Sequence, residues 1–327
     1  MIGKTRAYPK ELMILEAIVR RLPPNDLKKA DLEKKLYRKR AGYKGEKTLD
    51  YFLAQMDHSE MVILHDLRIP LNGTHFQIDT LIISPYFLLI IDSKNYAGTL
   101  IFLPEFNQLI RIQNNIEEVF SDPILQTKIQ GSQLRLFLEK HHITPPPIEN
   151  LVAISNTQAI IKNPANDQEV SYRVFRSANV SFKIPPFYKK YTQPLLSKNE
   201  MKKISRYLIK AHEPLVPDPK SMNLPFNKMI PGVQCPVCET FGMDYHQGKW
   251  TCTSCGHKSA QAPIQALRDY FLIYGPSITS KQFRAFMKVR SSSTAKRLLA
   301  TMDLSSLGTT KGRTYFPGKG FFDYEAL

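Results

Sequence analysis

The sequence predicts an α/β fold in which a mixed sheet is flanked by helices, followed by a smaller cysteine-bearing module and a helical C-terminal region. Three observations lead to this prediction. Two runs rich in Ile and Leu, at 76–83 and 87–91, are too short for ordinary helices and indicate buried strands. Stretches with helical patterning precede and follow these runs. All four cysteines form two C-x2-C pairs near the C-terminal end.

Length and composition indicate a multidomain globular protein. The chain has 327 residues, enough for two or three domains, and 43% of them are hydrophobic. The apolar run at 87–91 is far shorter than a membrane span, and the N-terminus lacks the pattern of a secretory signal. We therefore expect a soluble protein of the cytoplasm with no membrane partner.

The charge balance favours a nucleic-acid partner. There are 45 Lys and Arg residues against 29 Asp and Glu, a net charge of +16. Phosphate backbones are the commonest partner of so basic a surface. Solubility alone or attraction to anionic lipid would also fit such a charge. No basic amphipathic helix with a wide apolar face supports the lipid alternative.

The first 56 residues are expected to be helical. Residues 1–40 are predicted as a basic helical arm with helices over 11–21 and 26–40, which packs on the following domain or contacts phosphate. A further helix is expected from Gly45 to about Met56. Glu46 would lie in its first turn, where the helix dipole favours an acidic residue.

Strands and helices then alternate along the chain. Leu71–Thr74 and Ser84–Tyr86 are predicted turns, the first because Asn-Gly favours a hairpin. Asp122 is expected to cap a helix that has Pro123 at its first position. The expected strands are 61–70, 76–83, 87–91, 99–103, 108–113, 151–155, 169–174 and 180–184, and the expected helices are 122–141 and 199–211.

Three charged side chains converge where the two apolar strands meet. Asp92 and Lys94 share one face of their strand because side chains alternate with period two. A hairpin through Ser84–Tyr86 brings Asp79 onto the neighbouring strand. Burying such charges is costly unless they are paired or hold a metal. The alternatives are therefore a salt bridge at a strand end or a metal-dependent site.

Further motifs occur around these residues in a fixed order. They are G-Y-K-G-E at 42–46, F-Q-I-D at 76–79, I-I-D-S-K-N-Y-A-G at 90–98, D-P-I-L-Q at 122–126 and the strand at 151–156. This ordered set resembles the nuclease-related domain family, NERD, within the PD-(D/E)XK nuclease fold, and covers roughly residues 40–160. The chain departs from the family at Asp92, where the family usually has Glu.

The resemblance implies a restriction-endonuclease-like mixed sheet flanked by helices and a Mg²⁺- or Mn²⁺-dependent nuclease. Asp79, Asp92 and the Ser93 carbonyl would bind the metal, and Lys94 would act on the attacking water and the phosphate. Glu46 would hold a second metal or a water, and Gln126 would orient that water or a phosphate oxygen. The implied substrate is nucleic acid, and we expect DNA.

Two other functions are compatible with the sequence. The nuclease fold could be an inactive scaffold of a nucleic-acid-binding protein, which the departure at Asp92 favours. The chain could instead be a DNA-binding regulator that acts through its C-terminal domain. The intact acidic and basic set favours the enzyme, because a retired site need not keep buried charges.

The cysteines predict a structural zinc site. Cys235, Cys238, Cys252 and Cys255 form two C-x2-C pairs separated by 13 residues. Four thiolates on two tight turns complete a closed tetrahedral Zn²⁺ site, and the pattern resembles a zinc ribbon. The preceding segment 212–232 contains five prolines and no clear period, as a linker would.

The C-terminal region resembles a winged-helix DNA-binding domain. Three helices are expected at 263–274, 279–288 and 291–302, followed by a hairpin at 307–316. We expect nucleic acid to contact Lys296, Arg297, Lys311 and Arg313. A helical domain that packs on another protein surface is the alternative. The predicted segments are the arm 1–40, the nuclease-like domain 41–211, the linker 212–232, the zinc ribbon 233–258 and the winged-helix-like domain 259–327.

Overall fold

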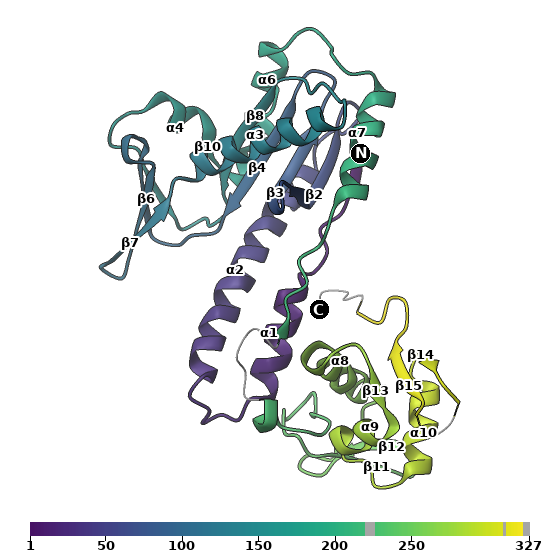
Figure 1. Ribbon diagram of the computed structural model, residues 1–327. Helices are drawn as coiled ribbons and strands as arrows, with labels where there is room; N and C mark the ends of the chain where they lie inside the picture. Colours follow the sequence, from purple (N-terminus) through teal and green to yellow (C-terminus); the bar gives the residue numbers. More distant parts are fainter. Residues whose placement is uncertain (220–225, 310–311, 323–327) are drawn as a thin grey trace. The chain divides into compact units, whose positions relative to one another are not determined.

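The computed structural model describes residues 1–219, 226–309 and 312–322 of the chain (Figure 1). The chain divides into two compact units, each built from two separate stretches of sequence. Unit 1 comprises Met1–Ala7 and Arg38–Leu215, and unit 2 comprises Tyr8–Tyr37 and Val216–Leu327. The division falls inside the long helix α2 (Lys29–Ala54), which therefore belongs to both units.

Unit 1 is built on a six-stranded mixed sheet with the strand order β1-β2-β3-β4-β8-β10. The pairs β2·β3 and β3·β4 are antiparallel, and the other three pairs are parallel. These strands are β1 (Ile2–Lys4), β2 (Val62–Leu71), β3 (Thr74–Ile83), β4 (Leu88–Lys94), β8 (Ile148–Ile154) and β10 (Val174–Arg176). The predicted turns at Leu71–Thr74 and Ser84–Tyr86 are confirmed, since they join antiparallel neighbours.

Apolar side chains cover both faces of this sheet, which explains why its strands have near-continuous runs of Ile and Leu. On β4, Leu88 and Ile90 pack into a cluster with side chains of helices α3 (Pro123–Lys140) and α7 (Lys198–Ala211). Leu89 and Ile91 alternate with them and pack with α2, α5 (Val180–Lys183) and α6 (Pro185–Lys190) on the other face. The sheet is therefore the middle layer of unit 1.

A second, four-stranded sheet in unit 1 has the order β7-β6-β5-β9. Its strands are β5 (Thr99–Leu103), β6 (Gln108–Gln113), β7 (Ile116–Ser121) and β9 (Ile160–Lys162), and single 3-10 turns occur at Pro104–Phe106 and Ser177–Asn179. The predicted hairpin over 99–113 is confirmed. Side chains of this sheet and of β8 form one apolar cluster. The cluster also includes Val170 of α4 (Gln168–Arg173).

Two strands expected from the sequence are helices instead. Residues 169–174 lie mostly in α4, because the Asp167 side chain accepts a hydrogen bond from the Val170 N–H and caps that helix. Residues 180–183 form α5, and Ile184 follows it with helical backbone angles. Val180, Ile184 and Phe187 are buried at the i, i+4 and i+7 spacing of a helix, which the strand interpretation overlooked.

Helix α2 is continuous from Lys29 to Ala54, whereas two helices were expected from the sequence. The sequence predicts helices over 26–40 and from Gly45 to about Met56, with a break between them. Glu46 consequently lies in the interior of the helix, and the expected interaction with an N-terminal dipole is absent. Packing against the sheet explains the glycine at 45. A Cβ there would lie 2.6 Å from the Asn95 Cβ and 2.5 Å from the Ser155 Oγ.

Unit 2 joins helix α1 (Lys10–Arg21) to the C-terminal elements. These elements are a 3-10 turn at Phe226–Lys228, β11 (Met243–His246), β12 (Lys249–Cys252), α8 (Ala262–Tyr274), β13 (Ile278–Thr279), α9 (Ser280–Met287), α10 (Ser292–Thr301), β14 (Leu304–Leu307) and β15 (Thr314–Pro317). Strands β13, β15 and β14 form a small antiparallel sheet, and β14·β15 confirms the hairpin predicted after the third helix.

A buried ion pair holds α1 to α8 within unit 2. The Asp269 carboxylate is inaccessible to solvent and lies 2.9 Å from the Arg21 Nε and 2.5 Å from the Arg20 Nη1. Arg21 also donates to the carbonyls of Ile230 and Gly232. Removing one partner of such a pair leaves an uncompensated buried charge. Residues 8–37 are therefore an integral part of unit 2, in contrast to the single arm 1–40 that was expected.

The two compact units group the residues differently from the predicted domains. The predicted domain boundaries remain predictions. Residues 220–225 of the predicted linker lie outside the described part of the chain, while Met229 is buried in a cluster with α1. Among the described residues, no helix combines the length and apolar character that crossing a membrane requires.

The close approach at Gly45 generates a stability prediction. We expect Gly45→Ala to lower the free energy of unfolding by about 1–3 kcal/mol, because its Cβ would overlap Asn95. Gly42→Ala is the matched control in the same helix, since no atom lies within 4 Å of its added Cβ. This control should be neutral or stabilise by up to about 1 kcal/mol. Urea unfolding of both variants measures the difference, and equal stabilities would contradict the packing argument.

Candidate functional site

Three of the predicted residues of unit 1 lie near the point where the β3·β4 ladder ends. Asp79 lies on β3, and Asp92 and Lys94 lie on β4. The β3·β4 ladder ends at the pair Thr80–Ile91, so Asp79 and Asp92 come next on their respective strands. Side chains on adjacent antiparallel strands at this level are direct neighbours.

The Asp79 side chain on β3 forms a hydrogen bond to the backbone of β4. Its Oδ2 accepts a hydrogen bond of 3.1 Å from the Ser93 N–H. Because Asp79 adjoins the Asp92 and Lys94 charges, it raises the pKa of both groups. Ser93 was predicted to contribute its carbonyl to a metal, and that role remains a prediction.

Lys94 contacts two of the other predicted catalytic residues, Asp92 and Gln126. Its Nζ lies 2.8 Å from the Asp92 Oδ2 and donates a hydrogen bond of 3.2 Å to Oδ1. It also donates to the Gln126 Oε1 at 3.0 Å. Gln126 is in the first turn of α3, where Asp122 caps the helix as predicted by accepting from the Ile124 N–H. The salt bridge considered from the sequence is therefore present, within a larger set.

Asp92 is strongly perturbed. The residue is 2% exposed, and burial together with the neighbouring Asp79 charge raises the pKa of Asp92 to about 6, although Lys94 opposes the shift. Burial by itself would lower the pKa of Lys94, but the Asp92 and Asp79 charges raise it above its ordinary value. The Asp92 Oδ2 lies in the 2.8 Å ion pair with the Lys94 Nζ, although it meets no hydrogen-bond geometry among the described residues. Lys94 therefore compensates part of this buried charge.

Glu46 is bound by Arg6, a residue that sequence reasoning missed. The Arg6 Nη1 lies 2.7 Å from the Glu46 Oε2, and the Arg6 Nε lies 2.9 Å from the Asp50 Oδ2. Burial and the Asp79 charge raise the pKa of Glu46 to about 8, against the opposing effect of Arg6. A single Arg separated by 40 residues from its partner gives no sequence signal.

Asp50 and His65 extend this set of polar residues. The His65 Nδ1 lies 3.1 Å from the Asp50 Oδ1 and from the Thr80 Oγ1. Burial lowers the pKa of His65 to about 4, which Asp50 only partly opposes. His65 is therefore a neutral hydrogen-bonding group at neutral pH.

The carboxylates do not converge as closely as the cysteines do. In the described part of the chain, the four cysteines are the one group of three or more His, Cys, Asp or Glu whose ligand atoms all lie within 4.8 Å of one another. Glu46, Asp79 and Asp92 form no such group. Their hard oxygen atoms are of the kind that Mg²⁺ and Mn²⁺ prefer, and the Asp92 carboxylate already contacts one cation, Lys94. Glu46 comes from a different element, helix α2.

The cysteine cluster has the geometry of a zinc site. Across the two C-x2-C turns, the Sγ atoms of Cys235 and Cys255 lie 3.7 Å apart, and those of Cys238 and Cys252 lie 3.5 Å apart. Tetrahedral Zn²⁺ with bonds of about 2.3 Å places its sulfur ligands about 3.8 Å apart. The residues present therefore fit a structural zinc ion, as expected for a zinc ribbon.

The local structure explains how both cysteine turns form. Strands β11 and β12 pair as a hairpin that ends at Cys252, and the Gly256 N–H donates to the Cys252 carbonyl. Gly256 has a φ of 73°, which favours glycine after the second turn. In the first turn, the Glu239 N–H donates to the Cys235 carbonyl.

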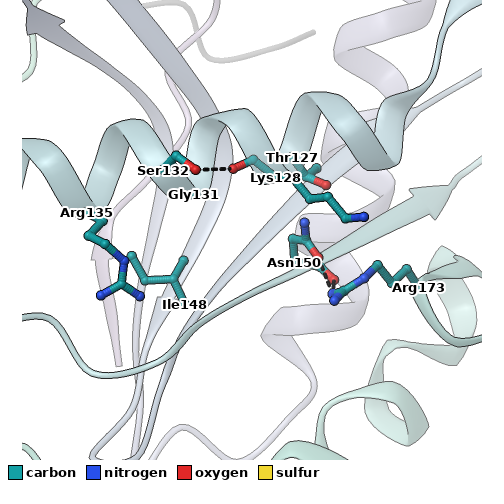
Figure 2. Close-up of a pocket in the computed structure, with 8 residues that line it drawn as sticks. All are labelled: Thr127, Lys128, Gly131, Ser132, Arg135, Ile148, Asn150 and Arg173. Atoms are coloured by element: carbon teal, nitrogen blue, oxygen red, sulfur yellow. Dashed lines mark hydrogen bonds between the residues drawn. The ribbon is translucent and has the colours of Figure 1, made fainter. Parts of the chain in front are cut away.

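A polar hollow of about 250 Å³ in unit 1 contains none of the predicted site residues (Figure 2). It is lined by Thr127, Lys128, Gly131, Ser132, Arg135, Ile148, Asn150 and Arg173. Glu169 pairs with Lys128 at 2.7 Å and with Arg173 at 2.8 Å. These carboxylate contacts offset the basic lining, so the hollow is a weaker candidate for an anion or substrate site than the ends of β3 and β4.

Three of the four basic residues predicted to contact nucleic acid are exposed in unit 2. Lys296 and Arg297 lie on α10, and Arg313 lies before β15 with its guanidinium 5.8 Å from the Tyr315 ring centre. Lys311 lies outside the described residues. Their contact with nucleic acid remains a prediction.

The cysteine geometry predicts bound zinc. We expect elemental analysis of protein purified without added metal to find about one zinc per chain. Cys238→Ser should reduce zinc content and lower the melting temperature of unit 2, because metal binding contributes to folding. Ser254→Ala, between two of the ligands, is the control and should retain zinc. Folded wild-type protein without zinc would contradict the assignment.

Comparison with known proteins identifies a related family for part of unit 1. Residues 41–155 match the family model of the nuclease-related domain, NERD. This stretch includes Glu46, Asp79, Asp92, Lys94 and Gln126, and excludes Arg6 and the cysteine module. No curated protein and no solved structure matches the chain. The match supports the predicted family for this segment and indicates a nuclease-related function, with a nucleic-acid partner.

Proposed function

We propose that unit 1 is a metal-dependent nuclease that hydrolyses phosphodiester bonds in DNA. The observation that carries this proposal is that Asp79 and Asp92 lie next to the last registered pair of the β3·β4 ladder, with Lys94 in contact with Asp92, inside the segment that matches the nuclease-related domain. Acidic ligands next to a lysine are the groups that metal-assisted phosphoryl chemistry needs.

Asp79, Asp92 and the Ser93 carbonyl would hold Mg²⁺ or Mn²⁺. When bound, the ion would polarise a phosphoryl oxygen and stabilise charge in the transition state. The neighbouring Asp79 charge supports this assignment, because two adjacent carboxylates carry more negative charge than Lys94 alone offsets. Asp92 is shorter than the Glu usual in the family, which places its oxygens closer to the strand.

Lys94 would position the attacking water and neutralise charge that develops on the phosphate. Gln126 is hydrogen-bonded to Lys94, so it would orient the same water or a phosphate oxygen. Glu46 would orient a water from the α2 side or hold a second ion. Its Oε2 is bonded to Arg6, and its Oε1 accepts no hydrogen bond among the described contacts.

A second candidate function is nucleic-acid binding without cleavage. The close Lys94–Asp92 salt bridge favours it, because an internal cation already compensates the buried carboxylate. Cleavage assays with metal separate the two functions.

Unit 2 would supply affinity for DNA. Three helices followed by the β14·β15 hairpin are consistent with a winged-helix-like domain, in which α10 and the hairpin contact the duplex. The region from Gly256 to Leu327 carries 11 Lys and Arg against 4 Asp and Glu, a net charge of +7. A regulator that acts through this domain alone would leave the acidic site of unit 1 unexplained.

The proposal predicts that Asp79→Asn and Asp92→Asn each reduce Mg²⁺-dependent cleavage of plasmid DNA by roughly a hundredfold or more. Each strand supplies a ligand that the other cannot replace. Both variants should keep or raise their melting temperature in EDTA, because removing one of two neighbouring carboxylates relieves repulsion. Asp92→Glu should retain activity.

Two further variants complete this test. Lys94→Met should abolish cleavage and also lower stability, because Asp92 loses its counter-charge. Glu117→Ala removes an exposed carboxylate on β7 and should change neither property. Wild-type rates in folded Asp79→Asn protein would sink the assignment, and cleavage unaffected by EDTA would exclude a metal requirement.

DNA binding should depend on the exposed basic residues of α10. We expect the full-length double variant Lys296→Ala, Arg297→Ala to lower the slope of log affinity against log salt by about two, because each phosphate contact contributes about one unit. Lys198→Ala with Lys202→Ala on α7 removes the same charge from unit 1 and is the control. Anisotropy of a labelled duplex measures both slopes, and equal losses would indicate a general charge effect.

A further inference from the structure

Arg6 joins the candidate site from outside the segment that matches the family model. It follows β1, which pairs in parallel with β2 at the edge of the main sheet of unit 1. The N-terminal amine anchors this strand by donating to the carbonyls of His58 and Met61, and the Lys4 Nζ donates to the carbonyls of His65 and Asp66. The Arg6 side chain is 2% exposed.

The guanidinium connects two elements that carry candidate catalytic residues. On α2 it contacts Glu46 at 2.7 Å, and its Nε and Nη2 contact the two Asp50 oxygens at 2.9 and 3.2 Å. On β3 its Nη2 donates to the Asp79 carbonyl at 2.8 Å. The planar fork of arginine suits this arrangement, because it fixes several acceptors at defined angles.

These contacts fix the two candidate residues at different atoms. Arg6 holds the Asp79 main chain, while the Ser93 N–H holds the Asp79 Oδ2. Arg6 also binds the Oε2 of Glu46. This contact fixes the orientation of the carboxylate and therefore the position of its other oxygen. Groups that orient a ligand in this way affect metal affinity without touching the metal.

We propose that Arg6 is a positioning residue that orients Glu46 and Asp79 for metal binding, so that residues 1–7 are a functional part of the nuclease site. This inference rests on the function proposed above. A lysine at this position would keep the charge and lose the fork, so it could not hold α2 and β3 together. A purely stabilising role would instead change metal affinity only in parallel with stability, in every variant that weakens this segment.

The test measures Mn²⁺ binding by electron paramagnetic resonance, without nucleic acid, on full-length zinc-loaded protein. Arg6→Lys should weaken Mn²⁺ binding about tenfold in protein that remains folded. Lys4→Met is the matched control, because it loosens the same N-terminal segment but contacts only carbonyls of β2. It should lower the melting temperature and leave the Mn²⁺ dissociation constant within about twofold of the wild type.

Asp50→Asn keeps the test decisive if Arg6→Lys does not fold. This variant removes the charge of the bidentate partner and leaves Arg6 with Glu46 and the Asp79 carbonyl. The proposal expects nearly wild-type Mn²⁺ affinity here, whereas a stabilising role expects parallel losses of stability and affinity.

The outcomes separate this inference from the proposed function. Two outcomes overturn the positioning role alone. One is that folded Arg6→Lys binds Mn²⁺ as tightly as the wild type. The other is that Asp50→Asn and Lys4→Met lose Mn²⁺ affinity in proportion to their loss of stability. If Asp79→Asn binds Mn²⁺ as the wild type does, the ion does not bind at this site, and both the positioning role and the proposed function are overturned.

Discussion

Carboxylates held at the end of an apolar sheet are the constraint on which unit 1 depends. The β3·β4 register places Asp79 beside Asp92, and burial raises the pKa of Asp92 to about 6 even with Lys94 in contact. Carboxylates in such a place need cations nearby. Lys94 supplies one from the same strand, and Arg6 supplies another from the N-terminal segment.

Neighbouring elements are arranged around this charge cluster. Helix α3 begins at a capped turn that brings Gln126 to Lys94. Helix α2 approaches closely enough that Gly45 has no space for a side chain, and the Asn95 amide donates to the Ala41 carbonyl. That approach brings Glu46 within reach of Arg6. Glycine in a helix interior costs stability, so its presence reflects this contact.

Unit 2 also contains a buried carboxylate that needs cations nearby. Asp269 is fully buried on α8 and receives two arginines from α1. Arg21 is further enclosed by the Phe286 ring, whose centre lies 4.4 Å from the guanidinium carbon. The first 37 residues therefore supply buried cations to both units, although they lie outside the segment that matches the nuclease-related domain.

The sequence by itself determined the local features. Apolar runs identified the strands that carry Asp79 and Asp92, Asp122 identified the start of α3, and the spacing of the cysteines identified their cluster, because each signal is contained in a short window. Tertiary structure decided what depends on distant partners. A helix continues through Gly45 because residues at the ends of β4 and β8 pack against it. Arg6 has no local signal, since only the parallel pairing of β1 with β2 brings it to Glu46.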